Sequence, residues 1–498
     1  MRDNTSTLNA AFAPRRLTGT RLDYTTLQRF FMGVGVFLVL MSPFSRDPLA
    51  FAACGILPWV ILRLIGSAYT PAAVAYYILW QWLQSFARVV QSLVDGETLA
   101  GGIYGPAVER AFWYSLASLL VIAIAFRLVL LGQRQPPTAA LAVAHRYWRV
   151  RDLFLLYLVS VVVSAICTYL SHAVPSLEQP FQAAGYVKVL ALVMLFSAVM
   201  TSGGKGWQIL VGVLLVEVLS GFTGLFSDFK SVFIYLAVTA VAARIRWNGT
   251  MAVATVALAT ILIGLGLFWT SVKGEFRQYA TGSSESQTVR TTLSSRFEYL
   301  GGKAADASDI DWDLAAYALL TRLAYIDIFG SVIGVQDVAP EPGYMRQWTD
   351  GLEHVLKPRF LFPNKPPLVD TEVFVRLARG DVTESLRGGT SISVGYMAEN
   401  YVDLGFPGML VGVFALASLA ALICRYFATR PVPWMMREGV VLAILYQMGH
   451  DGVEISLPKM LGTLLMTFAV WSIIARWGFP VILKWLGRPV SGNKARFA

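Results

Sequence analysis

Long apolar runs recur along almost the whole chain, and they limit the folds that it can adopt. Each run is about 17 to 25 residues, enough to cross a hydrocarbon core of about 30 Å as a helix. Hydrophobic residues make up 56% of the sequence and charged residues 14%. Because backbone groups in lipid must be hydrogen-bonded within their own segment, we expect an all-α, polytopic membrane protein. Twelve spans are predicted, at 29–44, 49–66, 70–90, 110–132, 153–172, 184–201, 207–226, 230–246, 250–271, 406–426, 437–453 and 460–476.

The distribution of Lys and Arg predicts the orientation of these spans. With the N-terminus in the cytoplasm, the cytoplasmic segments contain 22 basic residues and the short loops on the other side contain six. The net charge of +10 is then mainly a topology signal, and we expect no nucleic-acid partner. The predicted parts are an N-terminal cytoplasmic tail, spans one to nine, a large outer loop, spans ten to twelve and a C-terminal cytoplasmic tail, at 1–28, 29–271, 272–405, 406–476 and 477–498.

One long charged segment interrupts the apolar pattern. Residues 271–406 hold 13 of the 41 Lys and Arg and 18 of the 31 Asp and Glu, so their net charge is 13 − 18 = −5. Nine predicted spans precede this segment, which places it outside the cytoplasm. Within it, residues 314–335 are apolar apart from Arg322 and Asp327, and we expect a surface-lying or re-entrant helix there. The three cysteines fall in predicted spans without metal-ligand spacing, so we expect no metal and no cofactor.

Basic residues in this segment are candidate phosphate ligands. Lys273 and Arg277 leave the ninth span four residues apart, so they share one face if the helix continues. Like charges so placed repel unless an anion lies between them, and phosphate oxygens are common partners of Lys and Arg. Interfacial anchoring of the helix end is the alternative. Arg322 is either part of the same site or the partner of Asp327 in a structural ion pair.

A proline-rich basic stretch follows at 354–367. Three prolines within nine residues exclude a regular helix and impose an extended or turning path, on which Lys357, Arg359 and Lys365 are carried. A rigid basic segment at a membrane surface suits an anionic head group. His354 precedes this segment and Glu399 lies shortly before the tenth span.

Further polar residues lie in or near the spans. Glu217 is flanked by Val and Leu in the seventh span, where it either pairs with a basic residue, binds substrate or stays protonated. Asp228 and Lys230 either form a local ion pair or extend the basic site. The cluster from His450 to Glu454, at the outer end of the eleventh span, is interpreted as a solvated loop, with a role in the site as the alternative.

Two short motifs resemble those of bacterial O-antigen and exopolysaccharide polymerases of the Wzy type. They are the proline-flanked basic segment at 357–366 and the entry Glu399-Asn-Tyr-Val-Asp403-Leu-Gly-Phe-Pro-Gly into the tenth span. The Lys273-x-x-x-Arg277 exit is similar to a motif before the same loop in that family. Asp403-Leu404 replaces the family's usual Asn-Phe, and an Arg-x10-Gly pattern is not met by Arg376 and Gly388.

The resemblance implies a GT-C-like glycosyltransferase of the bacterial inner membrane. Such an enzyme joins oligosaccharide repeat units carried on undecaprenyl pyrophosphate at the periplasmic face and releases the lipid diphosphate. It needs no metal, and a flippase and a chain-length regulator are the implied partners beside membrane lipids. The implied base is Glu399, with His354 second. The implied diphosphate ligands are Lys230, Lys273, Arg277, Arg322, Arg359 and Lys365.

Two other functions fit the same sequence. An O-antigen ligase-like transferase would use the same donor with a different acceptor. A flippase or transporter of lipid-linked oligosaccharide is the third hypothesis. Against it, the sequence has no clear internal repeat and no matching pair of broken helices, and a transporter has little need for so long a charged outer segment.

Overall fold

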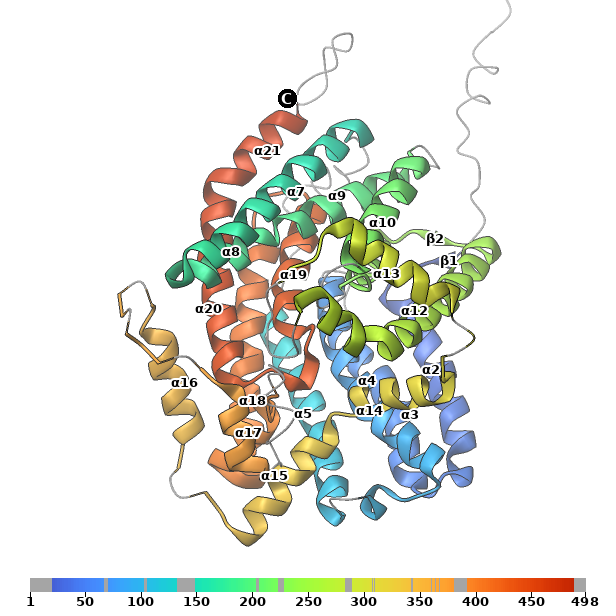
Figure 1. Cartoon of the computed structure of the whole chain (residues 1–498), viewed down its shortest axis with the longest axis vertical. Helices are drawn as coiled ribbons and strands as arrows, with labels where there is room; N and C mark the ends of the chain where they lie inside the picture. Colours follow the sequence, from blue (N-terminus) through green and yellow to red (C-terminus); the bar gives the residue numbers. More distant parts are fainter. Residues whose placement is uncertain are drawn as a thin grey trace, which may run out of the picture.

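The computed structural model is almost entirely helical (Figure 1). A single pair of short antiparallel strands, β1 (Thr20–Arg21) and β2 (Arg246–Trp247), is the sheet found in the described part of the chain. The structure describes residues 20–66, 70–102, 105–131, 148–202, 206–222, 228–282, 289–306, 308, 310–341, 344–359, 361–362, 364–366, 368–379 and 392–487.

Helices follow one another with short connections. The first half of the chain forms α2 (Tyr24–Met41), α3 (Pro48–Ile65), α4 (Ala72–Asp95), α5 (Pro106–Leu130), α7 (Val150–Ala173), α8 (Glu178–Gly185), α9 (Val187–Thr201), α10 (Trp207–Phe222), α11 (Ser231–Ala242) and α12 (Gly249–Thr281). The second half forms α13 (Leu293–Ala305), α14 (Trp312–Leu323), α15 (Ile326–Val338), α16 (Arg346–Leu356), α17 (Asp370–Ala378), α18 (Tyr396–Ala428), α19 (Trp434–Gly449), α20 (Leu457–Ile473) and α21 (Phe479–Leu486).

Among the described residues, eight helical segments are long and apolar enough to cross a membrane, which is typical of an integral membrane protein. Each of the twelve predicted spans coincides with a helix, but four of these helices fall short of that standard. Helices α10 and α11 have 16 and 12 residues, and α19 has 16. Helix α4 has 24 residues but carries many polar side chains. The total of twelve spans therefore stays a prediction.

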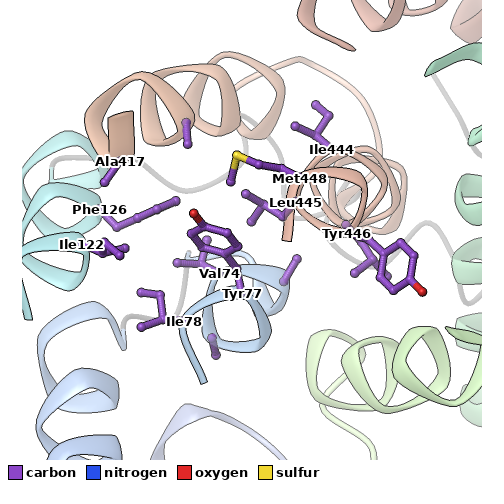
Figure 2. Close-up of a cluster of buried hydrophobic side chains, with 14 of the residues drawn as sticks. Val74, Tyr77, Ile78, Ile122, Phe126, Ala417, Ile444, Leu445, Tyr446 and Met448 are labelled. Atoms are coloured by element: carbon purple, nitrogen blue, oxygen red, sulfur yellow. The ribbon is translucent and has the colours of Figure 1, made fainter. Parts of the chain in front are cut away.

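The core lies where α4, α5, α18 and α19 meet (Figure 2). Tyr77 of α4, Phe126 of α5 and Met448 of α19 are each almost completely buried there. Helix α19 is buried on all sides along nearly its whole length, the expected place for a helix that is apolar all round. The core thus holds the C-terminal end of α19, and the loop that follows it, in a fixed position.

Helix α4 carries a buried polar stripe that reaches other parts of the chain. Gln84, Arg88 and Gln91 follow one another at helical spacing, and all three are buried. Arg88 Nε lies 2.7 Å from Asp327 Oδ1, and Gln91 Nε2 donates to Thr321 Oγ1. The predicted alternative of an Arg322–Asp327 pair is therefore wrong. The placement of Arg88 in a loop is also wrong, because the α4 helix continues to Asp95.

The charged segment is mostly helical, and the neighbouring helices extend into it. Helix α12 continues to Thr281, ten residues past the predicted span, and α18 begins at Tyr396, ten residues early. The predicted helix at 314–335 is two helices, α14 and α15, bent by 53°. Helix α14 packs on α4 and α12, while α15 packs on α5 and α16 on α20. Figure 1 shows α15 and α17 at the end of the molecule opposite α21.

Candidate phosphate and proton-transfer site

The loop from His450 to Ser456 is attached to α4 by a set of hydrogen bonds. Trp80 Nε1 donates to the His450 carbonyl at 3.0 Å, and Gln84 Nε2 donates to the Asp451 carbonyl at 3.2 Å and to Glu454 Oε1 at 3.3 Å. The Val453 amide donates to Gln84 Oε1 at 2.9 Å. These contacts give the loop one conformation, so the interpretation of a merely solvated loop is wrong.

His450 and Asp451 form an ion pair within this loop. His450 Nε2 lies 3.0 Å from Asp451 Oδ1, which leaves the other ring nitrogen for a second partner. Burial by itself would lower the pKa of the His450 ring. The hydrogen bond and charge of Asp451, with the charge of Asp228, instead raise that pKa above its ordinary value. A histidine oriented by a carboxylate in this way is suited to proton transfer.

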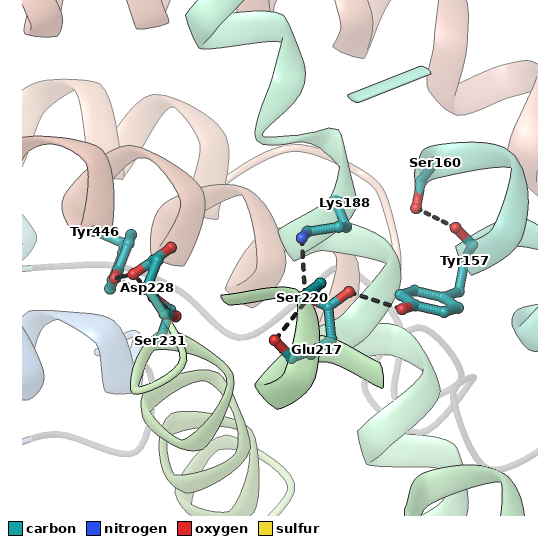
Figure 3. Close-up of polar contacts among 8 residues, drawn as sticks. All are labelled: Tyr157, Ser160, Lys188, Glu217, Ser220, Asp228, Ser231 and Tyr446. Carbon is teal, nitrogen blue, oxygen red and sulfur yellow. Dashed lines mark hydrogen bonds and ion pairs between the residues drawn. The ribbon is translucent and has the colours of Figure 1, made fainter. Parts of the chain in front are cut away.

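Asp228 lies beside this pair at the start of α11. Its carboxylate accepts hydrogen bonds from the Ser231 hydroxyl and, at 3.0 Å, from the Tyr446 hydroxyl, which also donates to Ser231 (Figure 3). Burial raises the pKa of Asp228. In the described part of the chain its carboxylate does not form an ion pair with Lys230, so the prediction of a local Asp228–Lys230 pair is wrong.

Glu217 is neutralised by a lysine from a neighbouring helix. Lys188 Nζ lies 2.8 Å from Glu217 Oε2, and the Tyr157 hydroxyl donates to Glu217 Oε1 at 2.7 Å (Figure 3). Pairing with a basic residue, one of the three outcomes predicted for Glu217, is confirmed. The pair ties α9 and α10 to α7.

These polar groups line a recess of about 880 Å³, which is within the range of ligand pockets. The recess lies between the helices α7 to α11 on one side and α19, α20 and their connecting loop on the other. Residues that line it and recur below are Lys188, Glu217, Asp228, Ser231, His450 and Asp451.

Four basic side chains gather next to this recess. Lys230 Nζ lies 5.7 Å from the centre of the Trp80 ring, the same side chain that bonds His450. Arg322, in the last turn of α14, is near enough to Lys230, Lys273 and Arg277 to repel each of them. We call Lys230, Lys273, Arg277 and Arg322 the cation cluster.

Apolar packing brings the members of the cation cluster together. Phe229, adjacent to Lys230, packs in a small cluster with Trp269 and Phe276 of α12. Lys273 lies between these two aromatic residues in sequence, and Arg277 directly follows Phe276. Because α12 remains helical to Thr281, the prediction that Lys273 and Arg277 share a helix face is confirmed.

Most of the positive charge of the cluster is not offset at contact distance. Within the described ranges, Lys230, Lys273 and Arg322 have no carboxylate within ion-pair distance. Glu454 is a carboxylate whose charge acts on Arg322, and burial raises the pKa of Glu454 to about 7. Since Glu454 is then about half protonated at neutral pH, the site retains a net attraction for anions.

Three other predicted site residues lie elsewhere. His354, Arg359 and Lys365 belong to α16 and the turn after it, where Lys365 Nζ donates to the His354 carbonyl. They adjoin a separate cavity beside α16, and Figure 1 shows α16 at the opposite side of the molecule from α12 and α14. The structure therefore brings together four of the six predicted diphosphate ligands. Arg376 pairs with Glu341, and Gly388 lies outside the described residues.

Glu399, the residue predicted as the base, is not available to a substrate. It is buried in the first turn of α18, and its carboxylate accepts the backbone N–H of Leu457 at the start of α20. Such a carboxylate satisfies an amide that the helix cannot pair internally and favours the helix N-terminus. The assignment of Glu399 as the base is thus wrong in this structure, because α18 begins ten residues earlier than predicted and encloses it.

Replacing Glu399 by glutamine tests this capping role. The amide oxygen of the new side chain can still accept the Leu457 N–H, so we expect Glu399→Gln to keep its fold and most of its activity. Glu399→Ala removes the acceptor and leaves a buried amide unpaired, which costs about 1–3 kcal/mol. Thermal unfolding in detergent and activity measure the two effects. Loss of activity in a stably folded Glu399→Gln variant would show that the carboxylate takes part in the chemistry.

One family model matches residues 111–455, more than half of the 498-residue chain. Its description is "Domain of unknown function (DUF8712)". The chain belongs to this family. No curated protein and no solved structure matches. The region matched by the DUF8712 family begins in α5 and ends at Ile455, so it contains the cation cluster and the His450–Glu454 loop, whereas α4 precedes it.

Proposed function

We propose that this protein is a membrane glycosyltransferase that polymerises oligosaccharide repeat units carried on a polyprenyl diphosphate, as Wzy-type polymerases do. The observation that carries the proposal is the cation cluster at the edge of a polar recess. Four basic side chains that lie close enough to repel one another form a site for a strongly anionic group, and the adjoining recess has room for sugar residues.

The cation cluster supplies what a diphosphate leaving group requires. Negative charge develops on the leaving oxygen as the bond to the anomeric carbon breaks, and fixed cations that face this charge lower the barrier. Lys230, Lys273, Arg277 and Arg322 carry that role in the proposal. Their mutual repulsion is relieved when the diphosphate binds, so binding and leaving-group stabilisation use the same residues.

The acceptor hydroxyl requires a base, and His450 is the best-placed residue. In the proposed step the acceptor oxygen forms the new bond to the anomeric carbon. The bond from that carbon to the diphosphate oxygen breaks, and the leaving diphosphate keeps the electron pair. The proton of the acceptor hydroxyl passes to the ring nitrogen of His450 that does not face Asp451, and Asp451 stabilises the resulting imidazolium.

In this proposal the cation cluster and the recess face the periplasm of a bacterial inner membrane. The orientation rests on the excess of Lys and Arg in the opposite set of loops, 22 against six. The lipid-linked repeat unit is presented on that side, with its chain in the bilayer.

The test is a reconstitution of the full chain in proteoliposomes with an undecaprenyl-pyrophosphate-linked oligosaccharide as the sole substrate. We expect lipid-linked chains of two and more repeat units, together with released undecaprenyl pyrophosphate. A ligase would need a separate acceptor lipid and would give a single transfer to it. Movement of the lipid-linked sugar across the bilayer without a new glycosidic bond would instead identify a flippase and refute the proposal.

A further inference from the structure

Helix α16 lies lengthwise beside the start of α20. Gly351 is packed against Leu457 and Pro458, and Val355 is packed against Gly462. A step of four residues along α16 thus matches a step of about five along α20, so the two helices run in the same direction. The backbone of Gly351 allows this close approach, since a Cβ there would meet the Leu457 side chain at 2.9 Å.

This register places the end of α16 at a depth inside the membrane. Leu457–Leu486 is one of the segments that is long and apolar enough to cross a bilayer. Gly462 is five residues into it, which is about 7 Å at a rise of 1.5 Å per residue. Val355, at the same level, is followed at once by Leu356 and by the turn at residues 357–366, which therefore lies below the membrane surface or at its boundary.

The side chains of this turn match that environment. Leu356, Leu361 and Phe362 are 70%, 63% and 45% exposed although they are large and apolar. Among them stand Lys357, Arg359 and Lys365, and an exposed apolar group with basic neighbours is the pattern of segments that bind the lipid interface.

Hydrogen bonds hold the turn in a compact shape. The Leu361 and Phe362 amides both donate to the Pro358 carbonyl, and the Lys365 amide donates to the Phe362 carbonyl. Beside the turn is a cavity of about 580 Å³, lined by residues that include His354, Lys357, Phe362 and Lys365. Because the turn is already folded, little ordering is needed when it binds.

We propose that the described residues of 356–366, which we call the α16 turn, form a binding site for a phospholipid of the surrounding bilayer. Leu356, Leu361 and Phe362 insert among the acyl chains. Arg359 and Lys365 bind the head-group phosphate, and an anionic head group is favoured. The site is distinct from the cation cluster and does not depend on the proposed glycosyl transfer. The basic segment that the sequence places in the substrate site is thus assigned to the bilayer instead.

Depth-dependent fluorescence quenching tests this assignment on the full chain in proteoliposomes. An environment-sensitive dye is attached to Leu361→Cys, to Leu356→Cys or to the control Tyr344→Cys, whose side chain is 94% exposed before α16. The natural cysteines Cys54, Cys167 and Cys424 are buried. We expect lipids spin-labelled near the head group to quench the dye at positions 356 and 361, while aqueous iodide does not. Tyr344→Cys is expected to show the reverse.

The vesicle composition separates the two parts of the site. Quenching at position 361 is expected to increase when phosphatidylglycerol replaces part of the phosphatidylcholine, and the double variant Arg359→Ser/Lys365→Ser is expected to lose this dependence. Access of iodide to position 361 equal to that at position 344 would overturn the proposal. Quenching without any dependence on the anionic lipid would overturn the head-group assignment. Polymerase activity is not needed for either result.

Discussion

Replacing Arg322 by alanine is expected to lower the rate of glycosyl transfer about 100- to 1,000-fold, the usual effect of removing one fixed charge that faces a developing anion. Arg322 is the common neighbour of the other three members of the cation cluster. Its loss therefore opens the centre of the diphosphate site. The variant should remain folded, because the ion pair that attaches this region to α4 is made by Asp327 and not by Arg322.

A matched control for Arg322 is available in the same charged segment. Lys303 is exposed and pairs with Glu275 on the outer side of α12, so Lys303→Ala removes a positive charge without touching the cluster. We expect it to keep the wild-type rate, since exposed pairs contribute little. Arg322→Lys should restore part of the rate, because it keeps the charge but not the planar donor pair. Equal rates for Arg322→Ala and Lys303→Ala would remove Arg322 from the site.

Replacing His450 by alanine is expected to lower kcat about 100- to 10,000-fold, the range that a general base contributes. His354→Ala is the control, because His354 lies at α16 away from the cation cluster. Full activity in His450→Ala, with loss in His354→Ala, would return the role of base to the residue that the sequence motifs suggest.

The pH profile tests the His450–Asp451 pair further. His450 must be neutral to accept a proton, so the rate should fall as the pH drops below its pKa. Asp451 raises the pKa of His450, so Asp451→Asn should shift this acidic limb to lower pH and decrease the maximal rate. An unchanged acidic limb in Asp451→Asn would show that the limb belongs to another group.

The helices were largely predictable, because lipid-spanning runs are long and carry a strong hydropathy pattern. The limits of the helices were not. Polar residues such as Lys273 and Glu399 read as loop in sequence, but α12 and α18 continue through them, since a helix can leave the apolar region without ending. That difference is what turned Glu399 from a candidate base into a buried cap.

The site was predictable where its residues lie close together in sequence. Lys273 and Arg277 belong to one helix face, whereas Lys230 and Arg322 join them only through the packing of Phe229 and of α14. The role of α4 was missed. Its polar stripe made a weak span in the hydropathy pattern, yet polar residues at helical spacing within an apolar helix are the mark of a buried polar face.

The basic turn after α16 illustrates the opposite error. Lys357, Arg359 and Lys365 have the composition of a phosphate site, and composition cannot distinguish a substrate phosphate from a lipid head group. The packing of Val355 against Gly462 beside a membrane-spanning segment makes that distinction.

The most direct measurement of the central claim is an experimental structure of the full chain in a lipid nanodisc with undecaprenyl pyrophosphate. The account predicts density for the two phosphates among Lys230, Lys273, Arg277 and Arg322, with the first sugar position opening toward His450. Diphosphate density between Arg359 and Lys365 at the α16 turn, with none at the cation cluster, would contradict it.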